Sequence, residues 1–211
     1  MLELKLIVGS IREGRSADLV IPWLVDRLEQ RSDFELEVLD LRDWPLPLFA
    51  ETLATLGDFR DPTYSVPMVR QWNQRIKDGE AFVFLTPEYN HSIPGLLKNA
   101  IDTVFASNGF RNKPAAFVSY SGGLAAGVRA IEHLAHVMIE MDAVPLRNTV
   151  PIANVYTAFE GSAPRDPATD VALDIMLDDL AWHGAALQRA RADGELPPGY
   201  HRMQAAMGAR T

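Results

Sequence analysis

Apolar and polar residues follow two repeating patterns along the chain. Short runs that are almost wholly apolar, such as "AFVFL" at 81–85, precede stretches in which apolar residues recur every three or four positions. The first pattern is typical of buried strands and the second of amphipathic helices. Together they predict strands near 2–9, 34–40, 80–86, 114–121 and 144–150, and helices near 16–30, 67–78, 95–107, 123–141 and 169–190. This repetition indicates an α/β fold built on a parallel sheet.

Two of these strands have the features of sheet edges. "FELEVLD" at 34–40 alternates apolar and polar residues over its first five positions, so one of its faces meets water. The last strand region contains Pro145 and Pro151. The other three strands then lie inside. We therefore predict a flavodoxin-like three-layer sandwich, with a five-stranded parallel sheet of order 2-1-3-4-5 and helices on both faces. Pro22 falls inside the first helix, which must kink there or begin later.

No linker divides the chain, so one domain is predicted over residues 1–190. The tail at 191–211 is expected either to pack on a partner or to stay disordered. The helix near 123–141 is apolar on more than one side and covers either a subunit interface or the loop at 41–66. Residues 50–66 are expected to overhang the ligand cleft.

Composition and charge exclude several classes of function. The 211 residues carry a formal net charge of −8, which argues against a nucleic-acid partner and against anionic membranes. No apolar run reaches the length of a membrane span and the N-terminus does not resemble a signal peptide, so we expect a cytoplasmic protein. The chain has no cysteine, which excludes disulfides and thiol chemistry. A redox function would therefore need a bound cofactor.

In a sheet of this order, ligands bind at the carboxyl ends of the strands, beside the first and third strands. The loops there are 9–16, 86–95 and 120–124. In the first loop, "GSIREGRS", Ser10, Arg12, Ser16 and a following helix N-terminus offer the donors that a phosphate group needs, with Arg15 as a further candidate. The alternative is that Ser16 only caps the helix. Neither the dinucleotide glycine fingerprint nor a P-loop is present.

The second loop, "TPEYNHSIPG", contains Pro87, Glu88, Tyr89 and Asn90. Its prolines hold the backbone in fixed directions, which suits the polar edge of a flat heteroaromatic ring, although a stiff exposed turn is the alternative. The third loop contains Ser121, Gly122 and Gly123, which either let a planar ligand approach the backbone or form a tight turn.

The segments "GSIREGRSAD", "TPEYNHSIPGLLKNAIDTV" and "NKPAAFVSYSGGLAAGVRAIEHL" resemble the NADPH-dependent FMN reductase family, and the similarity covers about residues 3–155. The resemblance implies a flavodoxin-like subunit that binds FMN and usually forms a homodimer or homotetramer. It implies that Ser10, Arg12 and Ser16 hold the FMN phosphate, that Pro87, Glu88, Tyr89 and Asn90 line the isoalloxazine, and that Ser121, Gly122 and Gly123 flank its other side.

The resemblance also implies that hydride passes from NADPH or NADH through flavin N5 to a small acceptor, such as a quinone, a flavin, an azo dye or a metal oxyanion. No side chain is then required as a catalytic acid, base or nucleophile. A flavodoxin-type electron carrier, which would not oxidise a nicotinamide itself, is the alternative. A metal site at His133 and His136 lacks further ligands in the sequence, so none is predicted.

Overall fold

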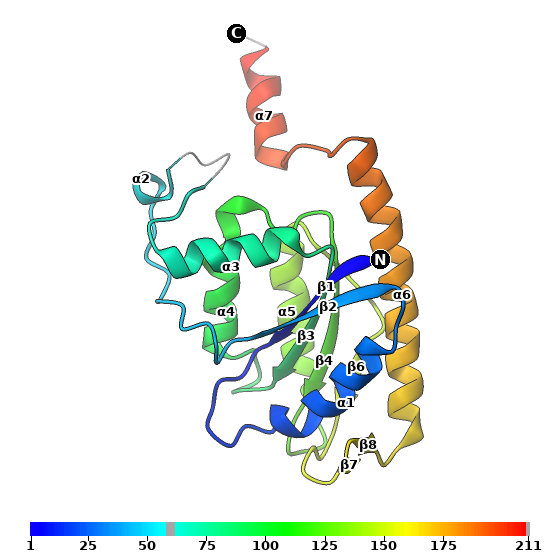
Figure 1. Ribbon diagram of the computed structural model, residues 1–211. Coiled ribbons are helices and arrows are strands. Elements are labelled where there is room, and N and C mark those ends of the chain that lie inside the picture. Colours follow the sequence, from blue (N-terminus) through cyan, green and yellow to red (C-terminus); the bar gives the residue numbers. More distant parts are fainter. Residues whose placement is uncertain (58–61, 210–211) are drawn as a thin grey trace.

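A parallel sheet lies at the centre of the molecule in the computed structural model, which describes residues 1–57 and 62–209. The strand order is β2-β1-β3-β4-β5, and β6 also pairs with β4 (Figure 1). The strands are β1 Leu2–Val8, β2 Phe34–Asp40, β3 Ala81–Pro87, β4 Pro114–Tyr120, β5 Val144–Pro145 and β6 Val150–Ile152. The predicted order is confirmed, with strands two and five at the edges.

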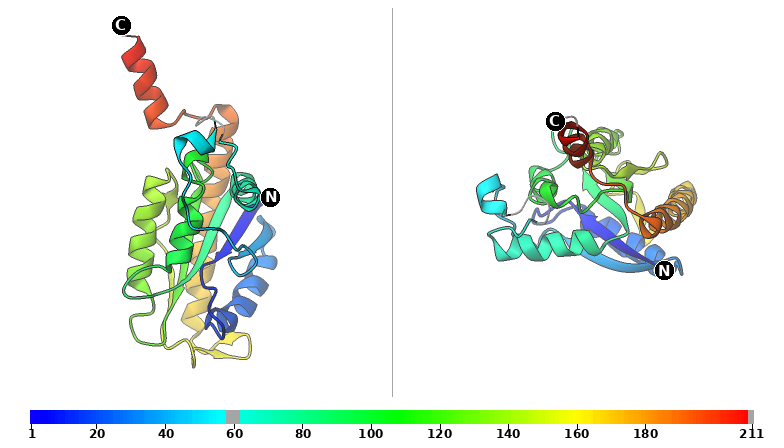
Figure 2. Two further views of the ribbon diagram at one scale, coloured as in Figure 1. Left: turned by 90° about the vertical axis from the view of Figure 1, so that its left-hand side faces the viewer. Right: turned by 90° about the horizontal axis from the view of Figure 1, so that it is seen from above.

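Helices cover both faces of the sheet, as predicted (Figures 1 and 2). One face carries α1 Ala17–Glu29 and α6 Pro167–Asp193, and the other carries α3 Pro67–Asp78, α4 Gly95–Asp102 and α5 Val128–Glu140. Because side chains alternate along a strand, Val83 and Leu85 of β3 pack towards α1 and α6, whereas Phe82 and Phe84 pack towards the other helices. This double burial explains why β3 is apolar at successive positions.

Pro22 lies inside α1, which runs through it as one helix and does not begin later than predicted. The missing N–H would have bonded the carbonyl of Asp18, and both residues are exposed to solvent. Water can therefore hydrogen-bond the freed carbonyl, and the helix continues.

The predicted strand at 144–150 is split into β5 and β6. Pro145 pairs with Ala115, and Val150 pairs with Val118. Between these two pairs the edge segment advances by five positions, whereas β4 advances by three. The two extra residues loop out after Pro145, which cannot donate to the sheet.

Two predicted helices are shorter than expected. Helix α5 begins at Val128 rather than at 123, because Ala126 and Gly127 have φ values of 55° and 84° and break the helix. A Cβ on Gly127 would lie 2.9 Å from the Cβ of Ser119 on β4, so this turn requires glycine. Helix α4 ends at Asp102, and a separate 3₁₀ turn follows at Phe105–Ser107.

The prediction that residues 50–66 overhang the ligand cleft is wrong for the residues described, and 58–61 lie outside that part of the chain. Helix α2 Leu53–Leu56 follows the long connection after β2. Leu56 and Tyr64 are buried against Ala106, beyond the far end of α4. The segment therefore packs against α3 and the 3₁₀ turn, away from the three candidate loops (Figure 1).

The C-terminal region forms more helix than the sequence indicated. Helix α6 continues beyond residue 190 to Asp193, after a small hairpin of β7 Phe159–Glu160 and β8 Ala163–Pro164. Helix α7 Gly199–Gly208 then projects from the end of α6, and none of its residues is buried (Figure 2). Its packing on a partner stays a prediction. Among the helices described here, none is long and apolar enough to span a membrane.

Candidate functional site

The three candidate loops meet in one pocket at the carboxyl edge of the sheet. The pocket has a volume of about 190 Å3 and is lined from the connections after β1, β3 and β4. Seven of the ten predicted site residues are in its wall: Arg12, Ser16, Pro87, Glu88, Tyr89, Ser121 and Gly122. The others adjoin it in sequence, since Ser10, Asn90 and Gly123 each lie within two positions of a lining residue. Gly14, Arg15, Tyr120 and Tyr156 complete the wall.

Ser10 is buried behind the pocket. Its hydroxyl oxygen lies 2.8 Å from the hydroxyl oxygen of Tyr89, which does line the pocket. The guanidinium of Arg12 lies 5.5 Å from the centre of the Tyr89 ring, within range of a cation–π interaction. Tyr89 therefore joins the first loop to the second.

Arg15 and Asp40 form the principal ion pair beneath the first loop. Arg15 is buried and donates to both carboxylate oxygens of Asp40, to the Ser10 carbonyl and to Asp18. Burial opposes the charged form of Asp40, but hydrogen bonds from Arg15 and from the Arg42 backbone hold the pKa of its carboxyl below the ordinary value. Since Arg15 is committed to these partners, Arg12 is the better candidate to contact an anion: it is exposed and makes no ion pair in the described part of the chain.

The N-terminus of α1 provides further donors at the same corner. Ser16 occupies the N-cap position, but its side chain makes no capping hydrogen bond. The backbone N–H groups of residues 14–17 donate to no other group in the described chain. An exposed guanidinium, an uncommitted hydroxyl and these N–H groups together suit a phosphate.

The second loop forms a tight two-residue turn. The Tyr89 N–H donates to the Ser92 carbonyl at 2.8 Å, and the Ser92 N–H donates back at 3.0 Å. Asn90 and His91 between them have φ values of 51° and 67°, which a turn of type I′ requires. Both residues are exposed, and their N–H groups donate to nothing else among the residues described.

Helix α5 holds this turn at two points. Arg129 forms an ion pair with Glu88, whose side chain is only 6% exposed. His133 Nδ1 lies 2.9 Å from the Ser92 hydroxyl. His133 therefore supports the turn, and the described residues contain no cluster that could bind a metal.

Two buried polar atoms at the pocket have no hydrogen-bond partner in the described chain. They are the Tyr120 hydroxyl and the second carboxylate oxygen of Glu88. Burial raises the pKa of the Tyr120 hydroxyl, which stays protonated as a donor. The Glu88 oxygen belongs to the ion pair with Arg129, whose Nε likewise lacks a partner among the described residues, so of these two groups the Tyr120 hydroxyl, beside Ser10, is the one that a ligand in the pocket can use.

The third loop is held by its own side chain. The Ser121 hydroxyl accepts from the Gly123 N–H at 3.3 Å and donates to the Gly123 carbonyl at 2.9 Å. A Cβ on Gly122 would lie 2.9 Å from the ring of Tyr156, so glycine allows this ring to close over the loop. Tyr156 was not predicted as a site residue, because it follows the last strand in a stretch with no motif.

Over residues 3–157 the sequence matches the model of the NADPH-dependent FMN reductase family. The chain belongs to this family. An NAD(P)H-dependent FMN reductase of a Nectria species is 31% identical over 157 residues, which cover 72% of this chain and 77% of that protein. An NAD(P)H:quinone oxidoreductase of Solanum tuberosum is 38% identical over 138 residues, 64% of this chain and 66% of that one. The flavoenzyme FerB, an NAD(P)H:(acceptor) oxidoreductase of Paracoccus denitrificans, has the same fold: the TM-score is 0.70 at 23% identity, over 88% of this chain and 98% of that chain.

Family membership confirms the predicted cofactor and reaction type, an FMN-dependent NAD(P)H oxidoreductase. The pocket fits that cofactor. Arg12 and Ser16 in its wall have the donors for a phosphate, and the exposed N–H groups of Asn90 and His91 lie next to lining residue Tyr89 in sequence. The buried hydroxyl of Tyr120 supplies a donor that nothing else in the described chain uses.

Proposed function

We propose that this protein oxidises NAD(P)H through bound FMN and delivers the electrons to a small quinone-type acceptor. The observation that carries the proposal is the convergence of three loops on one pocket, with anion donors in its wall and the buried Tyr120 hydroxyl, which has no partner in the described chain. The quinone-type acceptor is supported by the activity named for the Solanum tuberosum relative. NADPH as the preferred nicotinamide and a cytoplasmic location stay predictions from the sequence.

The residues have separate roles in this proposal. Arg12, Ser16 and the N–H groups of residues 14–17 bind the phosphate, and Ser10 supports them by fixing Tyr89. The backbone of Pro87 to Asn90 reads one edge of the ring, and Ser121, Gly122 and Gly123 shape the opposite side. When bound, FMN supplies the two-electron chemistry, so the chain needs no catalytic side chain and acts by binding and orienting.

Anaerobic reduction tests the proposal. Purified protein loaded with FMN is mixed with NADPH, or with NADH, and its absorbance near the visible flavin bands is followed. We expect the visible flavin absorbance to be lost after mixing with the nicotinamide and to return when 1,4-benzoquinone is added. A protein that binds FMN but is not bleached by either nicotinamide would instead be a flavodoxin-type electron carrier.

We also propose that the protein forms a homodimer or homotetramer through α4 and α5. A groove of about 580 Å3 between these helices is lined by apolar residues, among them Phe49, Val137 and Met141. Its lining also carries both signs of charge, positive from Lys98 and negative from Asp102 and Glu140. A face with both signs can pair with a copy of itself around a twofold axis.

Light scattering coupled to size-exclusion chromatography tests this interface. Val137→Lys places a charge in the groove and is expected to convert the oligomer to monomer. The control is Val171→Lys on α6, where the native valine is 57% exposed and lies outside the groove. A wild-type monomer, or an oligomer that survives Val137→Lys, would reject this interface.

A further inference from the structure

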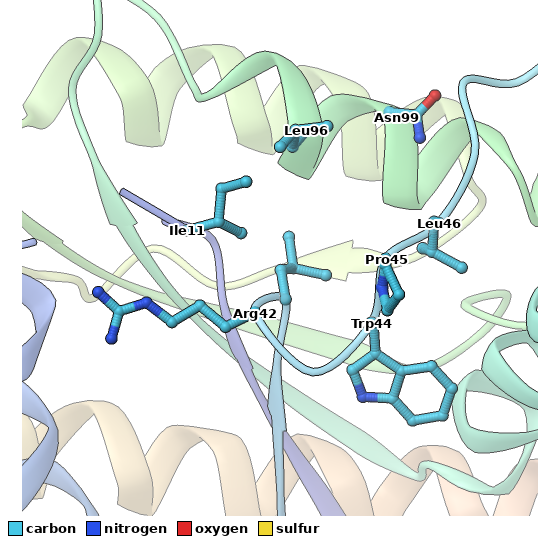
Figure 3. Close-up of a pocket in the computed structure, with 8 residues that line it drawn as sticks. Ile11, Arg42, Trp44, Pro45, Leu46, Leu96 and Asn99 are labelled. Carbon is cyan, nitrogen blue, oxygen red and sulfur yellow. The ribbon is translucent and has the colours of Figure 1, made fainter. Parts of the chain in front are cut away.

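A second hollow is lined in part by the first loop, which also lines the cofactor pocket. Figure 3 shows the residues around it. It has a volume of about 210 Å3 and is lined by Ile11, Leu41, Arg42, Trp44, Pro45, Leu46, Leu96 and Asn99. In Figure 3, Ile11, Leu96 and Pro45 surround the opening. Since Ile11 immediately precedes Arg12 of the cofactor pocket, the two cavities share this stretch of backbone as a wall.

The hollow exposes apolar side chains to solvent near the carboxyl edge of the sheet. Ile11 is 42% exposed and Leu96 is 38% exposed, whereas Leu41 behind them is buried. Large aliphatic side chains on opposite sides of a concave site lose water contact when a flat apolar ligand enters between them. The charge of Arg42 is matched by Asp18, which lies 3.1 Å away, so the hollow presents no free cation to an anion.

The walls are held in place without a ligand. Asn99 accepts from the Phe49 N–H at 2.8 Å and donates to the Pro47 carbonyl at 2.9 Å, which fixes the connection after β2 against α4. Trp44 packs edge-on against the buried Trp72, with ring centres 5.2 Å apart. Arg42 donates to the Arg12 carbonyl and so fixes the opposite side. Because the residues that line the hollow are already fixed, they lose little conformational entropy when a ligand binds.

Leu96 and Ile11, which line the hollow, each lie within or next to a proposed flavin-binding loop in the sequence. Leu96 lies in the first turn of α4, just after the turn at 89–92, and Ile11 lies between Ser10 and Arg12. A ring held between Ile11 and Leu96 would therefore lie next to the region where the proposed function places the isoalloxazine.

We infer that this hollow is the binding subsite for the ring of an uncharged aromatic acceptor, such as a benzoquinone. The inference rests on the proposed function. The overall reaction is balanced: the nicotinamide loses a hydride, the quinone takes up those two electrons and that proton together with one proton from water, and a hydroquinone leaves. The absence of an uncompensated cation makes the hollow unsuited to metal oxyanions.

Steady-state kinetics of two variants test the inference. Leu96→Ser and Ile11→Ser each remove apolar wall, and we expect the KM for 1,4-benzoquinone to rise about fivefold in either. The KM for ferricyanide, a highly charged acceptor that this hollow would not hold, should stay unchanged. The matched control is Leu48→Ser. Leu48 belongs to the connection after β2, which also lines the hollow, but it is 77% exposed and lies outside the hollow. Leu96→Met should restore the wild-type KM.

Two further measurements separate the possible failures. The dissociation constant of FMN, from flavin fluorescence, and the rate of anaerobic bleaching by NADPH should match wild type in Leu96→Ser. A raised FMN dissociation constant with an unchanged quinone KM would show that the hollow belongs to the cofactor site and would overturn the inference. An unchanged quinone KM in both serine variants would also overturn it. Wild-type protein that NADPH does not bleach would instead reject the proposed function.

Discussion

The hydroxyl oxygens of Ser10 and Tyr89 lie 2.8 Å apart and connect two loops that are 79 positions apart in the sequence. Ser10 is buried, whereas Tyr89 is half-buried in the wall of the cofactor pocket. The contact therefore fixes the proposed phosphate loop relative to the proposed ring-binding turn. The direct contact of Ser10 with the phosphate stays a prediction.

Tyr89→Phe tests this contact. The change removes the Tyr89 hydroxyl from the buried Ser10 hydroxyl, so we expect a loss of about 1 kcal/mol in the free energy of unfolding. FMN should bind several-fold more weakly, because the two loops are no longer fixed to each other. Urea denaturation and fluorescence titration measure the two effects. Ser107→Ala is the control, because it removes a part-buried hydroxyl that lies outside the pocket; an equal loss of FMN affinity in the two variants would contradict the prediction.

The sequence was sufficient to predict the sheet and the three loops because their signals are local. The alternation in 34–40 and the two prolines near 145 and 151 identified the edge strands. Once the strand order was known, the loops after β1, β3 and β4 had to meet at one edge. The residues that line the pocket follow from this topology.

Contacts between elements that are distant in the sequence could not be predicted from it. Arg129 is one of many polar positions on a long helix, and nothing local indicates its ion pair with Glu88. Tyr156 is brought over Gly122 by the path of the chain after β6. The interruption of the last strand was also missed, because the two extra residues after Pro145 are visible only in the pairing with β4.

The ion pair between Arg15 and Asp40 predicts a specific dependence of stability on pH. Asp40→Asn leaves the buried Arg15 without its main counter-charge and should lower the free energy of unfolding at pH 7 by about 2–3 kcal/mol. The pKa of Asp40 is lowered in the folded protein, so its contribution is complete above the ordinary carboxyl pKa of about 4. The contribution is then lost as the pH falls through the lower folded pKa.

Thermal denaturation between pH 3 and pH 7 measures this effect. The difference in Tm between wild type and Asp40→Asn should be largest at pH 7 and shrink towards pH 3. Asp43→Asn provides the comparison, because Asp43 is exposed on the same connection. A difference that is constant over the whole range would contradict the assignment.

Lys113 predicts a change in stability at alkaline pH. Its ammonium is buried, donates to the Lys77 carbonyl at 2.7 Å and lies 5.8 Å from the centre of the Phe82 ring. Burial lowers the pKa of Lys113 to about 7. Between pH 7 and the ordinary lysine pKa of about 10.4, the unfolded chain binds this proton and the folded chain does not. Folding stability therefore rises with pH in this window.

Lys113→Met removes that dependence. Relative to the variant, wild type should gain about 3–5 kcal/mol in the free energy of unfolding from pH 7 to pH 10, which urea denaturation measures at each pH. Lys77→Met is the control, since Lys77 is exposed on α3, outside the proposed interface. Parallel profiles for wild type and Lys113→Met would rule out the buried ammonium as the source.

The ion pair between Glu88 and Arg129 predicts a non-additive effect on FMN binding. Arg129→Gln leaves a carboxylate that is only 6% exposed without its counter-charge, and the proposed ring-binding turn loses one of its two attachments to α5. We expect about a tenfold rise in the FMN dissociation constant, from fluorescence titration. In the double variant Glu88→Gln/Arg129→Gln the buried charge is gone, so FMN should bind more tightly than to Arg129→Gln alone. Arg165→Gln, which breaks an ion pair with exposed Glu160 outside the pocket, should leave the dissociation constant unchanged. Purely additive effects of the two glutamine substitutions would mean that the pair does not act as a unit, and the turn would then owe its position to its own hydrogen bonds and to His133.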